Sequence, residues 1–220
     1  MTQAPLLLSL EVALCATVLA GLVGMAVAAL LANVKFRGRE VVEVVFTAPL
    51  VLPPTVLGYF LLVSLGRRSL IGHAYESLTG SSIVFTKTGA VLAAAVSALP
   101  FVVRFGRAAL ESVPTVYMQA ARTLGASPLR ALFAVQVPLA YRGLLAALML
   151  AFAKSLGDFG VTLMVAGDIP GETQTAALAV YDAIQAQRDH EAMMMVMVLT
   201  GVATGLLYIV GRWSRAKDEP

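Results

Sequence analysis

One charged pair stands inside an otherwise apolar stretch, and it is the clearest place for chemistry in this sequence. Lys154 and Asp158 are four residues apart within residues 141–166, so on a helix they lie on the same face. A lysine and a carboxylate at this spacing can neutralise each other, and a lysine can also offset the charge of a bound anion. Two interpretations stay open: a structural ion pair, or a Lys154 that faces an anion while Asp158 holds it in place.

Few other residues could support catalysis or metal binding. Cys15 is the single cysteine, which excludes an intramolecular disulfide and a multi-cysteine metal site. His73 and His190 lie in separate polar stretches, where solvated loop histidines are expected. We therefore expect no catalytic residue and no metal site in this chain.

The composition points to the membrane. The chain has 220 residues, of which 59% are hydrophobic and 13% charged, and its mean hydropathy is +0.83. Soluble domains average roughly 45–50% apolar and about 25% charged residues, so a soluble domain and a disordered chain are both excluded. The net charge of +3 includes no long basic run, so nucleic-acid binding is not expected.

Five apolar stretches are bounded by charged or turn residues: about 6–34, 41–65, 88–106, 141–166 and 192–211. A helix needs ~20 residues to cross a bilayer, and a backbone in lipid must satisfy its own hydrogen bonds, which favours helices. Residues 1–5 contain no lysine or arginine, so we expect the first stretch to be retained rather than cleaved as a leader. The sequence predicts an all-α polytopic membrane protein, with a single transmembrane domain over residues 1–220 and about five spans.

The distribution of lysine and arginine predicts how these spans are oriented. Basic residues collect in the cytoplasmic connections of membrane proteins. One side would hold Arg67, Arg68, Lys87 and Arg188, and Lys154 would lie inside a span. The other side would hold Lys35, Arg37, Arg39, Arg104, Arg107, Arg122, Arg130, Arg142, Arg212, Arg215 and Lys217. We therefore expect the N-terminus outside and the C-terminus in the cytoplasm.

The cytoplasmic connection over residues 107–140 has helix start and stop signals of its own. Pro114 suits the first turn of a helix, and Gly125 suits a left-handed cap at its end. Ser127 and Pro128 are typical of the N-cap and first position of a second helix, which Pro138 is expected to close. The sequence predicts two short helices joined by a sharp turn.

The first of these short helices carries an apolar stripe. Val116, Tyr117, Ala120, Ala121 and Leu124 recur at three- and four-residue spacing, which places them on one helix face. An apolar stripe in the cytosol either docks a partner or packs on the protein's own helix ends. The pattern alone does not choose between the two.

This connection also resembles a known family. The run QAARTLG over residues 119–125, followed by Val135, Val137 and Pro138, is similar to the cytoplasmic loop of ABC importer permeases. In that family Glu-Ala-Ala and a glycine precede Ile-x-Leu-Pro at the same spacing, so Gln119 and the two valines are departures. Residues 50–62, 155–160 and 169–175 resemble the oxyanion branch of the family, molybdate type.

The resemblance implies a type I ABC importer transmembrane domain that moves molybdate inward by alternating access, with sulfate, tungstate or another oxyanion as the alternative cargo. It implies a homodimer in the lipid of a bacterial inner membrane, two cytoplasmic ATPase subunits and an extracytoplasmic anion-binding protein. No cofactor is expected in this chain, because Lys87 and Lys154 lack the preceding glycine of a Gly-Lys-Ser/Thr phosphate loop. ATP and Mg would bind the ATPase. The residues expected to couple to it are Gln119, Ala120, Ala121, Arg122, Gly125 and Pro138.

The second apolar stretch contains Pro49, Pro53 and Pro54. Each proline lacks a backbone donor, so a helix must kink or break there. Irregular backbone at membrane depth is covered by protein or lines a water-filled cavity. Pro53, Pro54 and Thr55 therefore mark either a packing kink or, together with Lys154 and Asp158, a translocation path.

Two other function classes make different demands on the sequence. An intramembrane enzyme needs a nucleophile with a general base, or carboxylates around a metal, whereas this chain offers one mid-span pair, Lys154 and Asp158. A scaffold without transport predicts that transport continues when the two-helix connection is disrupted. The permease prediction explains more of the sequence than either alternative.

Overall fold

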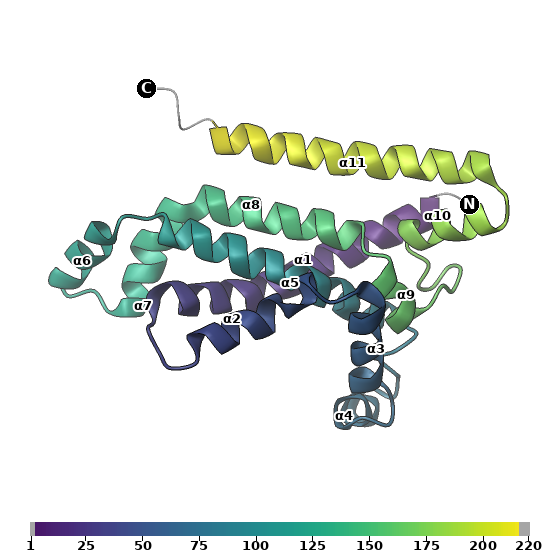
Figure 1. Ribbon diagram of the computed structural model, residues 1–220, viewed down its shortest axis with the longest axis horizontal. Coiled ribbons are helices and arrows are strands. Elements are labelled where there is room, and N and C mark those ends of the chain that lie inside the picture. The colour runs from purple at the N-terminus through teal and green to yellow at the C-terminus, as the bar shows by residue number, and fades with distance from the viewer. Residues whose placement is uncertain (1–2, 216–220) are drawn as a thin grey trace.

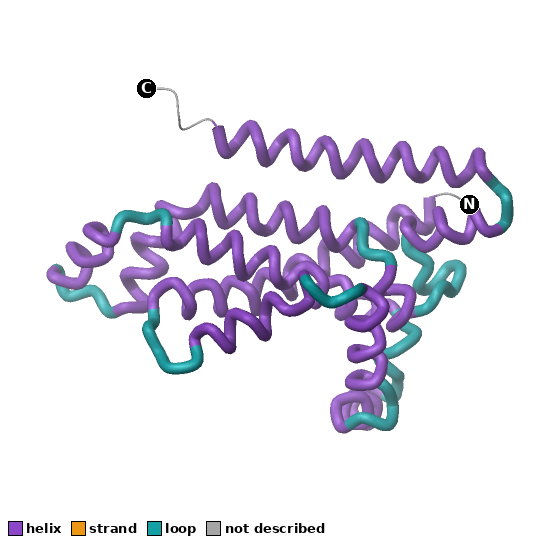
Figure 2. Tube along the Cα trace, viewed as in Figure 1, coloured by secondary structure: helices purple, strands orange, loops and turns teal. Residues whose placement is uncertain are grey.

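The computed structural model describes residues 3–215, which form helices joined by loops, with no strand among them (Figure 2). Three long helices run side by side as a bundle: α1 (Gln3–Asn33), α5 (Lys87–Glu111) and α8 (Val137–Leu156) (Figure 1). Small residues let them approach closely. A Cβ on Gly24 of α1, for example, would lie 2.7 Å from the Val102 Cβ of α5.

Three helical segments in the described part of the chain are long and apolar enough to cross a bilayer: Pro5–Asn33, Lys87–Glu111 and Pro128–Leu156. A fourth candidate is a bent pair, Arg39–Leu50 and Pro54–Leu65, whose two parts meet at 111°. It comprises α2 (Arg39–Thr47), the 3₁₀ turn η1 (Ala48–Leu50) and α3 (Pro54–Leu65). The break at the proline cluster is confirmed.

The segment Pro128–Leu156 begins earlier than the stretch expected from the sequence. It contains α7 (Pro128–Ala131), the π-helical turn η2 (Leu132–Gln136) and α8. Pro138 lies inside this continuous helix, so the prediction that it closes a helix is wrong. A proline ring clashes with the carbonyl four residues earlier. In η2 the bonds span five residues instead, as from the Val137 N–H to the Leu132 carbonyl, and this geometry accommodates the ring.

Residues 141–166, expected as one helix, form two. The helix α8 ends at Leu156, and α9 (Gly160–Ala166) starts after a short break. Gly157 weakens a helix by about 1 kcal/mol relative to alanine, and Asp158 suits the start of a new one. The break therefore falls on the predicted charged pair.

The remaining helices are α4 (Leu70–Thr79), α6 (Thr115–Thr123), α10 (Ala176–Gln185) and α11 (Asp189–Arg215). The helices α3 and α4 project away from the bundle, and α11 runs along the bundle beside α8 (Figure 1). The fifth predicted span coincides with α11, although the side chains at 206, 207 and 210 lie outside the described residues. Whether each helix crosses the bilayer at its predicted limits stays a prediction.

Candidate functional site

The helix α6 lies at one end of the molecule, beyond the ends of α5 and α8 (Figure 1). Gly125 follows it with φ +85°. The Gly125 N–H donates to the Arg122 carbonyl, and the Ala126 N–H donates to the Ala121 carbonyl. These two bonds are a Schellman motif, so the predicted glycine cap is confirmed. Pro114 precedes the helix as its N-cap residue rather than standing in the first turn.

The apolar stripe of α6 is exposed. The exposed fractions are 59% for Val116, 51% for Tyr117 and 88% for Leu124, and no residue of α6 is buried. Packing of the stripe on the protein's own helix ends is therefore not supported. Leu129 and Phe133 are exposed as well, and these five residues are called the α6 surface below. Of the predicted coupling residues, Ala121 is half-buried and the other five are exposed: Gln119, Ala120, Arg122, Gly125 and Pro138.

The α6 surface is joined firmly to the long helices. The Ser127 hydroxyl accepts a hydrogen bond from the Arg130 N–H at 3.3 Å, which confirms the predicted N-cap. From Pro128 the helix continues without a break to Leu156. The buried Gln136 amide donates to the Leu110 carbonyl of α5 at 3.1 Å. The segment that follows α6 is therefore continuous with α8 and hydrogen-bonded to α5.

A charge network on the same half of the molecule ties the bent pair to the bundle. Arg107 of α5 contacts Glu43 of α2 at 2.6 Å and Glu111 at 2.8 Å. Arg39 contacts Glu111 at 3.1 Å. Sequence reasoning did not identify these pairs. Arg39–Glu111 and Arg107–Glu43 join residues 72 and 64 positions apart, whereas Arg107 and Glu111 are four residues apart, a spacing that could have revealed their pairing.

The break between α8 and α9 is held by Asp158. Its Oδ1 accepts from the Lys154 Nζ at 2.8 Å, and its Oδ2 accepts from the Thr162 N–H at 3.1 Å and from the Thr162 hydroxyl at 2.8 Å. The predicted pair is therefore formed, but across a helix break instead of along one helix face. The side chain of Asp158 is 3% exposed and that of Lys154 is 37% exposed. The carboxylate is enclosed, whereas part of the lysine remains accessible.

The two breaks lie next to each other. A Cβ on Gly160, at the start of α9, would lie 2.7 Å from the Pro54 Cβ at the start of α3. A Cβ on Gly58 would lie 2.6 Å from the Met164 Cβ, so α3 and α9 pack with almost no separation. The structure thus brings the exposed residues Pro53, Pro54 and Thr55 close to the Asp158 break.

No group of three metal-ligating side chains occurs in the part of the chain that the structure describes. The site therefore consists of an exposed helical surface at one end and two adjoining helix breaks further along the bundle. Such an arrangement can transmit movement, and its helix breaks provide irregular backbone beside a charged group.

Comparison with known proteins agrees with this geometry. A family model described as "Binding-protein-dependent transport system inner membrane component" matches residues 20–216. The molybdenum transport system permease protein ModB of Escherichia coli K12 is 40% identical over 207 residues, covering 94% of this chain and 90% of the relative. The putative molybdenum transport system permease protein YvgM of Bacillus subtilis 168 is 35% identical, covering 94% of this chain and 91% of the relative.

The fold is also that of a solved transporter. A structure of the MetNI methionine ABC transporter in inward-facing conformations matches with a TM-score of 0.73 at 17% identity, covering 96% of this chain and 94% of the solved one. At this identity the likeness concerns the fold alone. On the match over most of its length, the chain belongs to the family of binding-protein-dependent transport system inner membrane components.

Proposed function

We propose that this chain is the permease subunit of an ATP-driven ABC importer that moves molybdate inward. The observation that carries the proposal is the exposed α6 surface at the end of a helix that runs unbroken to the Asp158 break. The cargo is inferred from relatives, since those named as molybdenum permeases are 35–41% identical across nearly the whole chain. Sulfate and tungstate are also tetrahedral dianions and are the alternative cargoes.

The proposed mechanism is alternating access driven from the α6 surface. Two ATPase subunits, which bind ATP and Mg, would each bind this surface on one copy of a homodimer. Their closure would tilt the segment Pro128–Leu156 as a rigid body. Because α9 follows Asp158 and packs on both α3 and α5, tilting of α8 would shift the two adjoining helix breaks. The path would then open to one side of the membrane at a time.

The surroundings of the chain follow from the same proposal. The N-terminus would lie outside and the C-terminus in the cytoplasm, with an extracytoplasmic binding protein delivering the anion on the side opposite α6. A second copy and membrane lipid would cover exposed apolar residues such as Leu70 and Leu78, which are 93% and 86% exposed. Such side chains would otherwise face water.

Lys154 is proposed to line the path. A dianion cannot cross hydrocarbon without compensation of its charge. Asp158 is enclosed and holds the Lys154 ammonium by one oxygen, while 37% of the lysine side chain stays accessible. Lys154 would offset part of the charge of the anion, and Asp158 would position it.

The docking role of α6 is tested by a matched pair of glycine variants. Gly125 and Gly171 have φ of +85° and +82°, and a Cβ on either would meet no atom within 4 Å. Alanine at either site therefore carries the same backbone strain, about 1–2 kcal/mol. Gly125→Ala disturbs the end of α6, whereas Gly171→Ala lies in the loop before α10.

We expect Gly125→Ala to reduce co-purification of the ATPase at least fivefold, while Gly171→Ala retains it. Membrane insertion of both variants is monitored by their yield in the membrane fraction. Equal retention of the ATPase by the two variants, at equal yield, would contradict docking on α6.

A further inference from the structure

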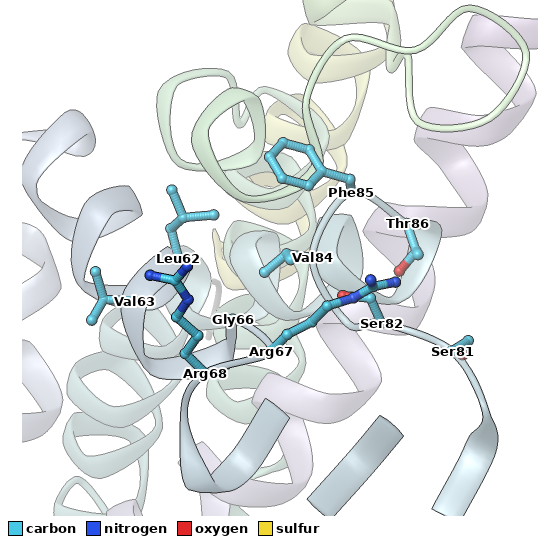
Figure 3. A pocket seen from close by; sticks show the side chains of 10 residues that line it. All are labelled: Leu62, Val63, Gly66, Arg67, Arg68, Ser81, Ser82, Val84, Phe85 and Thr86. Carbon is cyan, nitrogen blue, oxygen red and sulfur yellow. The ribbon is translucent and has the colours of Figure 1, made fainter. Parts of the chain in front are cut away.

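An open cavity of about 830 Å³ lies between the end of α3 and the loop that enters α5 (Figure 3). The N-terminus of α5 is at this end of the bundle, and its C-terminus leads toward α6 (Figure 1). The ten residues that line the cavity include Arg67 and Arg68 and no acidic residue. Ser81 and Ser82 add hydroxyl groups on the opposite wall. The lining therefore carries two positive charges and is otherwise apolar or neutral.

Both guanidinium groups retain N–H donors that could bind a ligand. Arg67 contacts Glu76 only through its Nε, at 3.4 Å, and its side chain is 68% exposed. Within residues 3–215 no carboxylate forms an ion pair with Arg68. In Figure 3 the Arg67 side chain extends toward Ser82 and Thr86, while that of Arg68 turns toward Leu62. The two guanidinium groups therefore point to opposite sides of the hollow, and only that of Arg67 lies near the serine and threonine side chains.

Arginine recognises phosphate-like groups by paired N–H donors, which a hydroxyl can supplement. A volume of this size lies within the roughly 300–1,000 Å³ typical of ligand sites. We propose that the cavity binds a tetrahedral oxyanion group through Arg67, with Ser81 and Ser82 as neutral donors and Arg68 adding positive charge from the other side. The group belongs either to the transported anion or to the phosphate of a membrane lipid. The first source rests on the proposed function, whereas the second does not.

The cavity wall is connected to the helix breaks. Phe85 has a φ of 59°, unusual for a residue with a side chain, and its N–H donates to the Val165 carbonyl of α9 at 2.9 Å. The hydroxyl of Thr86 donates to the Ile83 carbonyl at 2.6 Å and caps α5, so it fixes the loop instead of serving the ligand. Since the Asp158 carboxylate accepts from the Thr162 N–H in the first turn of α9, the cavity wall is hydrogen-bonded to the helix that begins at the break next to Lys154.

The test compares a double variant, Arg67→Gln with Arg68→Gln, with Arg37→Gln. Arg37 is an exposed arginine in the loop between α1 and α2, so the control removes a positive charge far from the cavity. The full-length permease, in complex with its ATPase and reconstituted in nanodiscs, is titrated with sodium molybdate at constant ionic strength. Phospholipid that stays bound to the complex is measured in parallel by native mass spectrometry.

We expect the double variant either to bind molybdate at least tenfold more weakly or to lose a bound phospholipid, while Arg37→Gln does neither. The first result identifies the free anion as ligand, and the second identifies the lipid phosphate. The double variant Arg67→Lys with Arg68→Lys should bind with intermediate affinity, which separates loss of the site from misfolding. If the wild type and the double glutamine variant do not differ in molybdate binding or in retained phospholipid, the proposal is overturned. Co-purification of the ATPase is expected to be unchanged in every variant, so failure of this site is distinguishable from failure of the docking proposal.

Discussion

At the scale of single residues, the Lys154–Asp158 pair separates a structural role from a role in transport. Lys154→Met leaves the enclosed Asp158 carboxylate without its counter-charge, which costs about 3 kcal/mol. Adding Asp158→Asn removes that charge and keeps a side-chain oxygen that can accept from the Thr162 N–H. We therefore expect the double variant to regain most of the melting temperature lost in Lys154→Met, measured on detergent-solubilised protein.

Uptake then distinguishes the two interpretations of the pair. If Lys154 offsets the charge of the anion, the stable double variant still imports molybdate at least tenfold more slowly than the wild type in proteoliposomes. Full recovery of uptake along with stability would show that the lysine only neutralises Asp158.

Asp168, in the loop between α9 and α10, should make stability depend on pH. Burial raises the pKa of its carboxyl above the ordinary value, the charge of Asp182 raises it further, and Gln174 acts in the opposite direction. Its Oδ1 has no hydrogen-bond partner among the described residues. Because the folded state holds this proton more tightly than the unfolded chain, the stability it contributes is present below the ordinary aspartate pKa and is lost as pH rises through the raised one.

Asp168→Asn is therefore expected to raise the melting temperature at pH 7 to 8, with the difference from wild type shrinking toward about pH 4. Thermal unfolding across this range measures it. Glu172→Gln removes an exposed carboxylate from the same loop and should change little. An increase in melting temperature for Asp168→Asn that is the same at every pH would show that the raised pKa of Asp168 is not its cause.

The charged pair was visible in the sequence because two charges four residues apart stand out in an apolar stretch. The donors that complete the Asp158 site were not, since Thr162 has a role there only once a helix starts after the break. Gln136 was missed for a related reason, because its partner Leu110 lies 26 residues earlier.

At the scale of elements, Pro138 is predicted to set the register between α6 and α8. Pro138→Ala removes the ring that excludes the ordinary hydrogen bond, so η2 is free to relax to an α-helix. A π turn holds one residue more than an α-helical turn. Its relaxation to an α-helix would therefore rotate α6 and α7 by about 100° relative to α8. The α6 surface would still bind the ATPase, but its movement would reach α8 in the wrong direction.

We expect Pro138→Ala to lower the amount of anion imported per ATP hydrolysed by at least threefold, with ATPase co-purification preserved. Both rates are measured in proteoliposomes that contain the binding protein. Pro128→Ala is the control, because a proline in the first turn of α7 accommodates its surroundings without strain. An unchanged ratio in Pro138→Ala would rule out this role of η2.

The helix limits could be predicted where a residue restricts the backbone to one conformation. Pro53 and Pro54 follow each other in an apolar stretch, and the break that they predict is present. Gly125 could be predicted as a cap for the same reason. Pro138 and Gly157 each allowed two outcomes, because a π turn tolerates a proline within a helix and a glycine is compatible with either a helix or a break. The break after Gly157 lets α9 pack on α3 and α5, and η2 is held to α5 by the bond from Gln136 to the Leu110 carbonyl.

At the scale of the whole molecule, the two proposed contact regions lie at opposite ends of one helix. The helix α5 has 25 residues, which at 1.5 Å per residue is about 37 Å and exceeds the thickness of a bilayer core, about 30 Å. The α6 surface follows its C-terminus, and the arginine-lined cavity adjoins its N-terminus. A rigid element of this length can link events on the two faces of a membrane.

This separation makes the orientation measurable with single cysteines. Cys15 is the only native cysteine, so Cys15→Ser gives a background without thiols, into which Ser81→Cys or Leu124→Cys is introduced. Both positions are exposed, and the excess of basic residues on the α6 side places that side in the cytoplasm. We expect a membrane-impermeant maleimide to label Ser81→Cys in intact spheroplasts and Leu124→Cys only after permeabilisation. Arg37→Cys should behave like Leu124→Cys, since both connections are predicted on the same face. Labelling of Leu124→Cys in intact spheroplasts would show that the topology is the reverse of the predicted one. The α6 surface would then be out of reach of any cytoplasmic ATPase.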